Sequence, residues 1–447
     1  MSRLAHDVRT GWRVLRAEGL RAAVDRARDR LDERRERRGA AAAAPGDLGR
    51  APVLNVLAMP PSPRLGGVPT QLRNRLAFER QERPCAVLHP QGGGWRLHHR
   101  HRSESRALDL DGAGFEDAVR RAMRETGAMA VHAEGVAGLP IEGLLALARE
   151  GARLLVSIHD FAAFCRRPHL VERPADRFCG YCRDLDRCHA CLRHDFDVDA
   201  GFQARYRERG AELLRAAEAL VFPSRFLREA HRGLFPGLEP ARQHVIEPGT
   251  PPLDDAPGRA GASAPRVRAV RHVAWVGAVQ VHKGALVFEQ VVRQLQADAL
   301  PLRWTALGGG DASLLARFRA LPRVAVRGYW RAGSLPVVLR HLGADLALLL
   351  STWPEAYGLT LDECWRAGVP AVAFDHGAMA DRVRRLGGGL LVPPAEGAEG
   401  VARAIRQAVA GPAPAAPAAQ LLPDPRQAAA AHLELYRALG LMAAGSA

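Results

Sequence analysis

Short apolar runs alternate along most of this chain with longer segments of helical character, and this alternation restricts the fold more than any other feature. A run such as residues 346–350 (LALLL) is typical of a strand that is buried on both faces. Where strands and helices alternate, the strands usually form a parallel sheet. The sequence therefore predicts an α/β protein. We expect strands at 53–59, 86–89, 128–132, 154–159, 219–223 and 244–246, then at 272–276, 304–307, 324–327, 346–350, 371–374 and 390–392.

Linker-like segments divide the chain. With 447 residues, the chain is long enough for two or three domains, each with its own core. A Gly/Ala-rich segment at 39–50 and a Pro/Gly/Ala-rich segment from 249 to about 265 have the composition of linkers. We predict a basic helix and linker at 1–50, an α/β domain at 51–250 with a cysteine-rich insert at 165–191, a linker at 251–268, a second α/β domain at 269–418 and a helical segment at 419–447.

Lys283 is the single lysine among 63 basic residues. It lies in the loop that follows the predicted strand 272–276 and leads into a helix. Such loops are where α/β proteins hold phosphates, and a lysine ammonium provides a point charge for a phosphate group. The alternative is that this one lysine remains by chance on a solvent-exposed turn and binds nothing. The interpretation of Lys283 therefore depends on other residues.

Two glutamates, Glu355 and Glu363, follow the predicted strand 346–350, with seven residues between them. We expect a helix that starts at 359 or 360 and ends at 368, with Glu355 on the loop before it and Glu363 in its first turn. Amides at a helix start point outward with the positive end of the helix dipole. Here they belong to Gly358, Leu359 and Thr360. One small volume would thus offer amides for a phosphate and carboxylates for sugar hydroxyls.

These motifs resemble the signature of retaining glycosyltransferases of family 4. The resemblance rests on Pro-Glu-Ala-Tyr-Gly at 354–358, on Glu363, on Ala-Gly-Val-Pro at 367–370 and on Lys283 followed by glycine. It implies the GT-B fold, in which two Rossmann-like domains face each other across a cleft and a C-terminal helix packs back on the N-terminal domain. It also implies that Glu355 binds the donor sugar, Glu363 the nucleotide ribose and Lys283 the diphosphate leaving group.

Two details refine this resemblance. Thr-Trp-Pro-Glu at 352–355 and Asp-His-Gly-Ala at 375–378 are most similar to enzymes that build bacterial surface polysaccharides. Many relatives carry a second diphosphate cation, an arginine, where this chain has Ala278. Either another arginine replaces that cation, or His282 contributes to the diphosphate site.

The N-terminal half offers candidates for the same site. Gly66 and Gly67 follow the first strand and open a helix, where residues without Cβ let backbone amides approach a ligand. An ordinary turn is the alternative. His159 ends a predicted strand and so reaches the carboxyl edge of the sheet. The resemblance implies that His159 and Asp160 face the donor sugar, whereas a structural histidine is the alternative. We expect His132 to be a packing residue.

Two further residues are candidates for nucleotide contacts. Gly308 opens a run of three glycines after the predicted strand 304–307 and resembles the glycine-rich turn that lies beside the nucleotide in this family. By the same resemblance, Tyr329 would stack on the nucleobase. A structural tyrosine is the alternative.

Five of the seven cysteines fall within 165–191. Two Cys-x-x-Cys pairs suit a tetrahedral zinc ion, although their spacer of five residues is shorter than the usual one. The predicted ligands are Cys179, Cys182, Cys188 and Cys191, with Cys165 or His169 as a further candidate. An iron–sulfur cluster and free thiols are the alternatives. Cys85 and Cys364 are expected in the core.

Charge and hydropathy limit partners and location. A net charge of +15 suits nucleotide diphosphates, lipid-linked pyrophosphates or an anionic membrane face. Residues from about 8 to 38 have the pattern of a basic amphipathic helix, which would lie on a membrane or pack on protein. No apolar run is long enough to cross a bilayer, and the N-terminus lacks an apolar signal core. We therefore expect a cytoplasmic protein, with the inner face of the membrane as the alternative location.

Together, the residues and the resemblance predict a glycosyltransferase. It would move a sugar from a nucleotide-diphosphate sugar to a glycan or lipid-linked acceptor with retention of configuration, in surface polysaccharide synthesis. No cofactor would be required for catalysis, so any zinc would be structural. A nucleotide-sugar epimerase of the same fold is an alternative, although epimerases lack this two-glutamate loop. A zinc-dependent nucleic-acid-binding protein is another, but the basic residues are spread along the chain and few aromatics lie beside the cysteines, so we expect no nucleic-acid partner.

Overall fold

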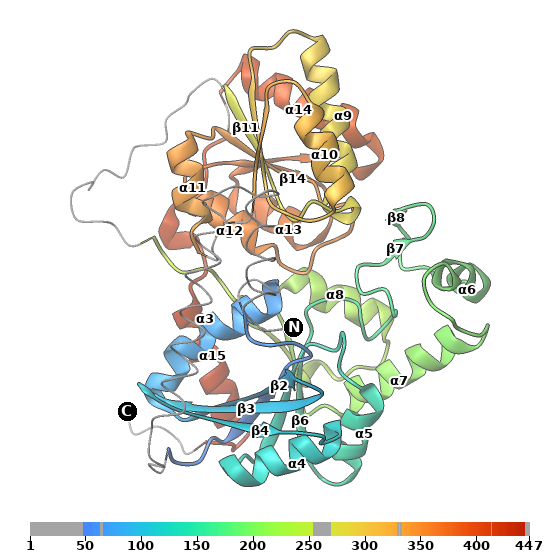
Figure 1. Cartoon of the computed structure of the whole chain (residues 1–447), viewed down its shortest axis with the longest axis vertical. Coiled ribbons are helices and arrows are strands. Elements are labelled where there is room, and N and C mark those ends of the chain that lie inside the picture. Colours follow the sequence, from blue (N-terminus) through green and yellow to red (C-terminus); the bar gives the residue numbers. More distant parts are fainter. Residues whose placement is uncertain are drawn as a thin grey trace, which may run out of the picture. The chain divides into compact units, whose positions relative to one another are not determined.

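The computed structural model describes residues 48–62, 66–253, 270–328, 330, 333–412 and 414–442. The predicted N-terminal helix and Tyr329 lie outside the described residues. The chain forms two compact units (Figure 1). Within the described residues, unit 1 comprises Pro252–Pro354 and Gly358–Leu422, whereas unit 2 comprises the chain up to Pro251, Glu355–Tyr357 and the segment from Pro423 onward.

Unit 1 is built on a fully parallel six-stranded sheet, as predicted. All six predicted strands are present, and their order in the sheet is β13-β12-β11-β14-β15-β16. Their bounds are β11 His272–Val276, β12 Arg303–Leu307, β13 Val324–Arg327, β14 Leu346–Leu349, β15 Ala371–Phe374 and β16 Gly389–Val392. The helices between them are α9 Ala285–Ala297, α10 Ala312–Ala320, α11 Leu335–Leu342, α12 Leu359–Arg366, α13 Gly377–Leu386 and α14 Gly397–Ala410.

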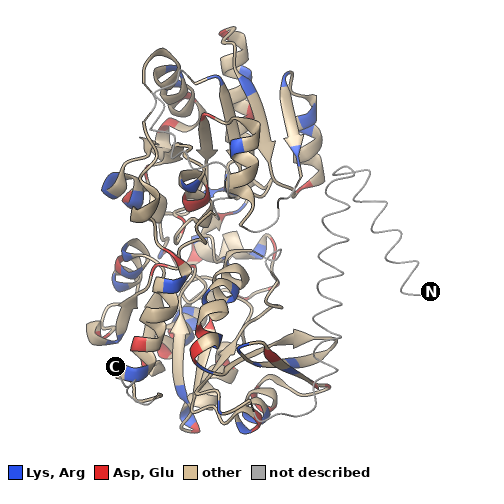
Figure 2. Cartoon of the chain, turned by 90° about the vertical axis from the view of Figure 1, so that its left-hand side faces the viewer, with Lys and Arg blue, Asp and Glu red and all other residues tan. Residues whose placement is uncertain are grey.

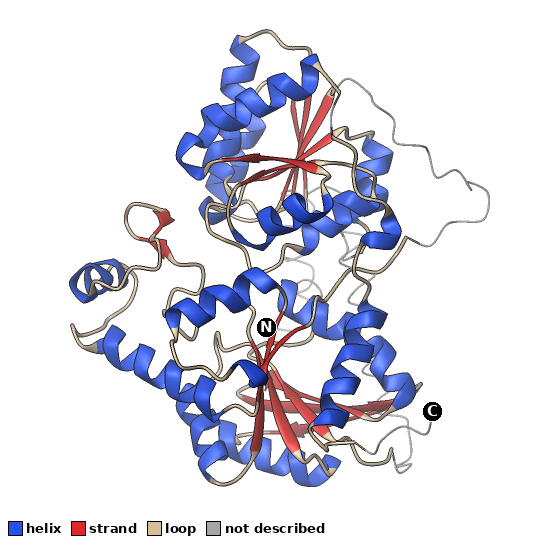
Figure 3. Cartoon of the chain, turned by 180° about the vertical axis from the view of Figure 1, so that it is seen from behind, coloured by secondary structure: helices blue, strands red, loops and turns tan. Residues whose placement is uncertain are grey.

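Helices cover both faces of this sheet (Figure 3). The alternation of side chains along β11 explains why: Val273 and Trp275 pack into one apolar cluster, whereas Ala274 and Val276 pack into another on the opposite face. The first cluster includes Phe288 of α9. Burial on both faces is the reason that strands of this sheet are nearly continuous apolar runs.

Unit 2 contains an eight-stranded mixed sheet with the order β10-β9-β6-β5-β1-β2-β3-β4. The strands from β10 to β2 are parallel, and the predicted strands of this half are all present within them. Their bounds are β1 Val53–Val56, β2 Cys85–Gln91, β5 Ala130–Glu134, β6 Arg153–Ser157, β9 Ala219–Phe222 and β10 Gln243–Val245. The helices are α3 Gly67–Glu82, α4 Phe115–Thr126, α5 Ile141–Arg149, α6 Leu185–Arg193, α7 Phe202–Ala216 and α8 Arg225–Leu234.

Two strands of this eight-stranded sheet were not predicted. β3 Gly94–His101 and β4 Glu104–Leu110 extend the sheet in antiparallel fashion beyond β2. β3 contains two arginines and three histidines and is only partly buried, and β4 is the largely exposed edge strand. Gly92 and Gly93, both with positive φ, form the tight turn between β2 and β3.

The last helix, α15 Pro425–Ala438, belongs to unit 2 and lies against α3 (Figure 1). Asp424 begins it with a capping box to Gln427. Its residues Leu433 and Tyr436 are buried in the cluster that also contains Val53 of β1. The helix thus completes the core of unit 2.

Two features of the whole chain bear on partners. In the part of the chain that the structure describes, no helix has both the length and the apolar character that a bilayer span needs. Figure 2 shows that basic and acidic residues are interspersed along the elements rather than separated. This arrangement does not favour the nucleic-acid-binding alternative, which needs a continuous basic surface.

Candidate functional site

The strand order of unit 1 reverses direction at β11, whose neighbours are β12 and β14. In open α/β sheets, ligands bind outside the carboxyl ends of the strands at such a switch point. The loop after β11 carries Lys283, and the loop after β14 carries Glu355. The topology therefore brings the two sequence motifs of this half to one edge of the sheet.

Lys283 is held beside the loop that follows β14. It ends a short 3-10 helix, Val281–Lys283, and Gly284 follows with a φ of 79°. A Cβ at Gly284 would overlap the backbone carbonyl oxygen of Leu350, so this close approach requires glycine. The amide of Thr352 donates a hydrogen bond of 3.0 Å to the carbonyl of His282. The ammonium of Lys283 then lies 5.6 Å from the centroid of the Trp353 ring.

The helix α12 follows the same loop. Gly358 is its N-cap residue, with a φ of 85° and Met379 so close that a Cβ would lie 2.6 Å from its Cγ. The N-cap residue Gly358 has no side chain that could cap α12, and amides at a helix start point away from the helix body. Leu359 and Thr360 lie in this first turn and are partly exposed. The geometry suits an anionic ligand.

Glu363 was predicted in the first turn of α12. The helix starts at Leu359, so Glu363 is its fifth residue and lies just beyond that turn. Its Oε1 accepts a hydrogen bond of 3.2 Å from the amide of Gly333. Burial raises the pKa of Glu363 to about 7, and the neighbouring Asp362 acts in the same direction, against the Gly333 amide. Near neutral pH the carboxyl group is thus present in both forms and can accept or donate a hydrogen bond.

The other predicted residues of this half have simpler surroundings. Glu355 lies on the loop between β14 and α12 and is half-buried. Gly308 follows β12, and a Cβ there would overlap the carbonyl oxygen of Gly277 at the end of β11. Glycine at 308 therefore has a packing reason whether or not a nucleotide binds beside it.

In unit 2, Gly66 is the N-cap residue of α3 and Gly67 is the first residue of this helix. Both glycines are exposed. Within the described residues, no side chain caps this helix either. The loop that carries them follows β1, which lies between β5 and β2 at the switch point of this sheet.

His159 lies two residues beyond β6, and 11% of its side chain is exposed. In the described structure, neither of its ring nitrogens has a hydrogen-bond partner. The carboxylate that faces the ring is that of Glu134, whose Oε2 lies 3.9 Å from Nε2. Asp160, the acid that follows in sequence, instead accepts a hydrogen bond of 2.8 Å from the amide of Ala162.

Sequence reasoning missed Glu134 and the arginine that binds it. Arg75 of α3 donates hydrogen bonds of 2.7 Å to both Glu134 and Asn55. Burial opposes ionisation of Glu134, but Arg75 above all, with His132 and His159, holds the pKa of Glu134 well below its usual range. The only sequence signal was the place of Glu134, at the end of a buried strand next to the one that leads to His159.

His132 is a packing residue, in agreement with the sequence. Its side chain is fully buried. One ring nitrogen lies 2.9 Å from the hydroxyl of Tyr436, and the other lies 2.8 Å from that of Ser157. Its pKa is lowered to about 4 because burial disfavours the charged ring. A neutral imidazole whose two ring nitrogens both have hydrogen-bond partners, one on β6 and one on α15, has a structural role.

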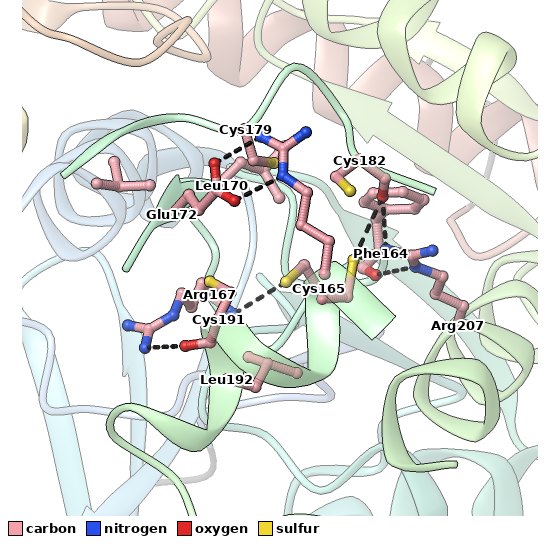
Figure 4. A pocket seen from close by; sticks show the side chains of 13 residues that line it. Phe164, Cys165, Arg167, Leu170, Glu172, Cys179, Cys182, Cys191, Leu192 and Arg207 are labelled. Atoms are coloured by element: carbon pink, nitrogen blue, oxygen red, sulfur yellow. Dashed lines mark hydrogen bonds and ion pairs between the residues drawn. The ribbon is translucent and has the colours of Figure 1, made fainter. Parts of the chain in front are cut away.

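The five clustered cysteines line a single cavity of about 20 Å³ (Figure 4). This cavity lies in the insert that contains α6 and the hairpin of β7 Val171–Glu172 and β8 Arg177–Phe178. The amides of Arg167 and Arg173 donate to Cys165 Sγ at 3.4 Å and to Cys191 Sγ at 3.3 Å. Over the residues that the structure describes, no three His, Cys, Asp or Glu side chains are placed to hold a metal ion. The zinc site with Cys179, Cys182, Cys188 and Cys191 as ligands therefore stays a prediction.

Comparisons with known proteins agree with the architecture. Residues 270–410 match the family model of glycosyl transferases group 1. The sucrose-phosphate synthase of Thermosynechococcus elongatus is a similar solved structure, with a TM-score of 0.62 and 18% identity over 88% of this chain and 99% of that chain. A glycosyltransferase from Rickettsia africae gives 0.53 and 13%, over 87% and 98%.

Anabaena HepE in complex with UDP gives a TM-score of 0.51 and 15% identity, over 87% of this chain and 100% of that chain. A search of curated proteins found no match. The similar structures have the GT-B fold with two Rossmann-like domains, and this chain shares it. Together with the family match over 270–410, the fold supports a glycosyltransferase.

Proposed function

We propose that this protein transfers a sugar from a nucleotide-diphosphate sugar to a glycan or lipid-linked acceptor with retention of configuration. The observation that carries the proposal is the hydrogen bond from the Thr352 amide to the His282 carbonyl, which holds the Lys283 loop against the loop that leads to α12. The family match covers this region. The similar structure of Anabaena HepE was solved with UDP and with UDP-glucose, which supports the choice of donor class.

In this proposal the leaving diphosphate is stabilised electrostatically. Lys283 would provide one positive charge, and the amides at the start of α12 would provide oriented dipoles. Donors that are already in place when negative charge develops lower the barrier without reorganisation. Glu355 would bind hydroxyls of the donor sugar and Glu363 those of the ribose. His159 would contact the donor sugar.

The proposed biological setting is surface polysaccharide synthesis in the cytoplasm or at the inner face of the membrane. It rests on the resemblance of residues 352–355 and 375–378 to enzymes of that kind. The net charge of +15 is compatible with a lipid-linked pyrophosphate acceptor or an anionic membrane surface.

The proposal is tested first by binding. UDP, GDP and ADP should each be added to the purified protein, because a ligand that binds only the native state raises its melting temperature. At least one should do so, and transfer should then be assayed with the corresponding nucleotide sugars. The configuration of the new bond, read by NMR of the product, tests retention.

Lys283→Ala should reduce transfer by about 10²–10³-fold, the usual effect of removing one preorganised charge-stabilising group. Arg293→Ala, on the exposed side of α9 in the same unit, is the matched control and should retain full activity. If Lys283→Ala is as active as Arg293→Ala with the true donor, the proposed diphosphate site is wrong.

A further inference from the structure

We infer that Glu134 is a positioning residue for His159 and that Arg75 holds Glu134 in this role; the functional part of this inference rests on the proposed function. The two residues meet because β5 and β6 are adjacent and parallel, with Glu134 opposite Ser157 in the sheet register. Both strands therefore deliver the residues at their carboxyl ends to one edge. Nothing in the local sequence around His159 indicates this partner.

The imidazole of His159 needs a partner. Both of its ring nitrogens are buried, and no hydrogen bond is made to either within the described residues. A buried polar atom without a partner costs about 1–3 kcal/mol. The 3.9 Å between Nε2 and Glu134 Oε2 is about 1 Å longer than a normal hydrogen bond. Such bonds are often long in ligand-free sites and shorten when a ligand binds.

The carboxylate of Glu134 is itself fixed. Arg75 donates to its Oε1 at 2.7 Å, and Glu79 holds the other side of the Arg75 guanidinium, at 2.9 Å from Nε. The exposed fractions of the three side chains are 6% or less. A buried carboxylate is retained only with a charged or hydrogen-bonding partner. Arg75 occupies one oxygen, so the other, Oε2, remains directed at His159.

The consequence is a defined tautomer. In the neutral ring, a hydrogen bond to Glu134 places the proton on Nε2 and leaves Nδ1 as an acceptor. His159 would then accept a hydrogen bond from a sugar hydroxyl rather than donate one. Asp160 makes its described hydrogen bond to the Ala162 amide, through Oδ1, and none to the His159 ring.

Two substitutions test this without depending on the reaction. Long-range ¹H–¹⁵N spectra of protein labelled at histidine nitrogens report which ring nitrogen carries the proton, and His159→Asn identifies the signal. We expect the Nε2–H form in the wild type and the Nδ1–H form in Glu134→Gln, because its one amide oxygen pairs with Arg75 and its NH₂ group then donates to Nε2. Glu134→Ala should give a mixture. If His159 shows the same tautomer in Glu134→Ala as in the wild type, the inference is wrong.

Kinetics add a second readout. Glu134→Ala should lower kcat by about 10–100-fold, as second-layer partners usually do, with the donor KM changed less than about threefold. Glu134→Gln should lower kcat to a similar extent because it reverses the tautomer, and the exposed Glu150→Ala should behave as wild type. In a His159→Ala background, Glu134→Ala should have no further effect. Equal kcat in Glu134→Ala and Glu150→Ala would overturn the inference.

These outcomes separate the two claims. Absence of transfer by the wild type with every nucleotide sugar would count against the proposed function, whereas the tautomer measurement would still test the Glu134–His159 contact. If Glu134→Ala has a folding defect, its melting temperature will be lower than that of the wild type. In that case Glu134→Gln and Arg75→Met serve as the test. Arg75→Met should release Glu134 and give mixed tautomers.

Discussion

Replacing Glu363 by glutamine should stabilise unit 1, and the gain should grow as the pH rises. Burial raises the pKa of Glu363 to about 7 from its ordinary 4.5. Because the folded-state pKa lies above the unfolded-state value, the contribution of Glu363 to stability is fully present below about pH 4.5 and is lost as the pH rises through about 7. For a displacement of this size, the loss approaches about 3 kcal/mol at high pH. Glutamine keeps the shape and can still accept from the Gly333 amide, but it does not ionise.

The assay is urea unfolding of wild type and Glu363→Gln at pH 5.5 and pH 8. Tryptophan fluorescence reports mainly on unit 1, because five of the seven tryptophans lie from Trp275 to Trp365. The difference in unfolding free energy between the two proteins should widen by about 2 kcal/mol over this pH interval. The control is Glu399→Gln on the exposed side of α14. Its difference from wild type should be the same at both pH values.

A Glu363→Gln advantage that is constant with pH would refute the reasoning. It would mean that Glu363 ionises alike in the folded and unfolded states, so that burial of its carboxyl group is compensated by a positive or hydrogen-bonding partner. A shrinking advantage would reverse the sign of the argument and place such a partner close to the carboxylate.

Three further predictions concern stability and metal content. Gly284→Ala should lower the melting temperature and also activity, because its Cβ would overlap a backbone carbonyl and its φ of 79° is unfavourable for alanine. Arg382→Met should cost about 3–5 kcal/mol, as it leaves Asp362 buried without its ion-pair partner, and adding Asp362→Leu should recover most of this in urea unfolding. Metal analysis under reducing conditions should find about one zinc per chain, lost in Cys179→Ser but retained in Cys85→Ser, and a metal-free wild type would exclude the zinc site.

The sequence predicted unit 1 better than unit 2 because their strands differ in burial. The central strands β11, β14 and β15 are apolar and buried throughout, so each is a recognisable apolar run. β3 is instead only partly buried and carries several arginines and histidines, and β4 is a largely exposed edge strand, so neither is an apolar run. The turn at Gly92 and Gly93 was the available indication of a hairpin.

A candidate residue could be predicted from the sequence where its position depends on a single loop. Lys283 was identified by its place between a strand and a helix, and the parallel sheet then brings its loop to the one before α12. The start of α12 at Leu359 agrees with the prediction, and Glu363 is its fifth residue, one position beyond the predicted first turn. Arg75 and Glu134 are separated by 59 positions, and their pairing depends on how α3 packs against the sheet.

The same topological rule places the candidates of both units. In unit 1 the sheet order reverses at β11, whose loop carries Lys283, and the adjacent β14 is followed by α12 with Glu363. In unit 2 it reverses at β1, whose loop carries Gly66, and the adjacent β5 ends at Glu134. Sequence alone can therefore locate such an edge, because strand ends are visible in it. Which side chains pair there depends on sheet register and on helix packing, and for this reason the partner of His159 emerges only from the folded chain.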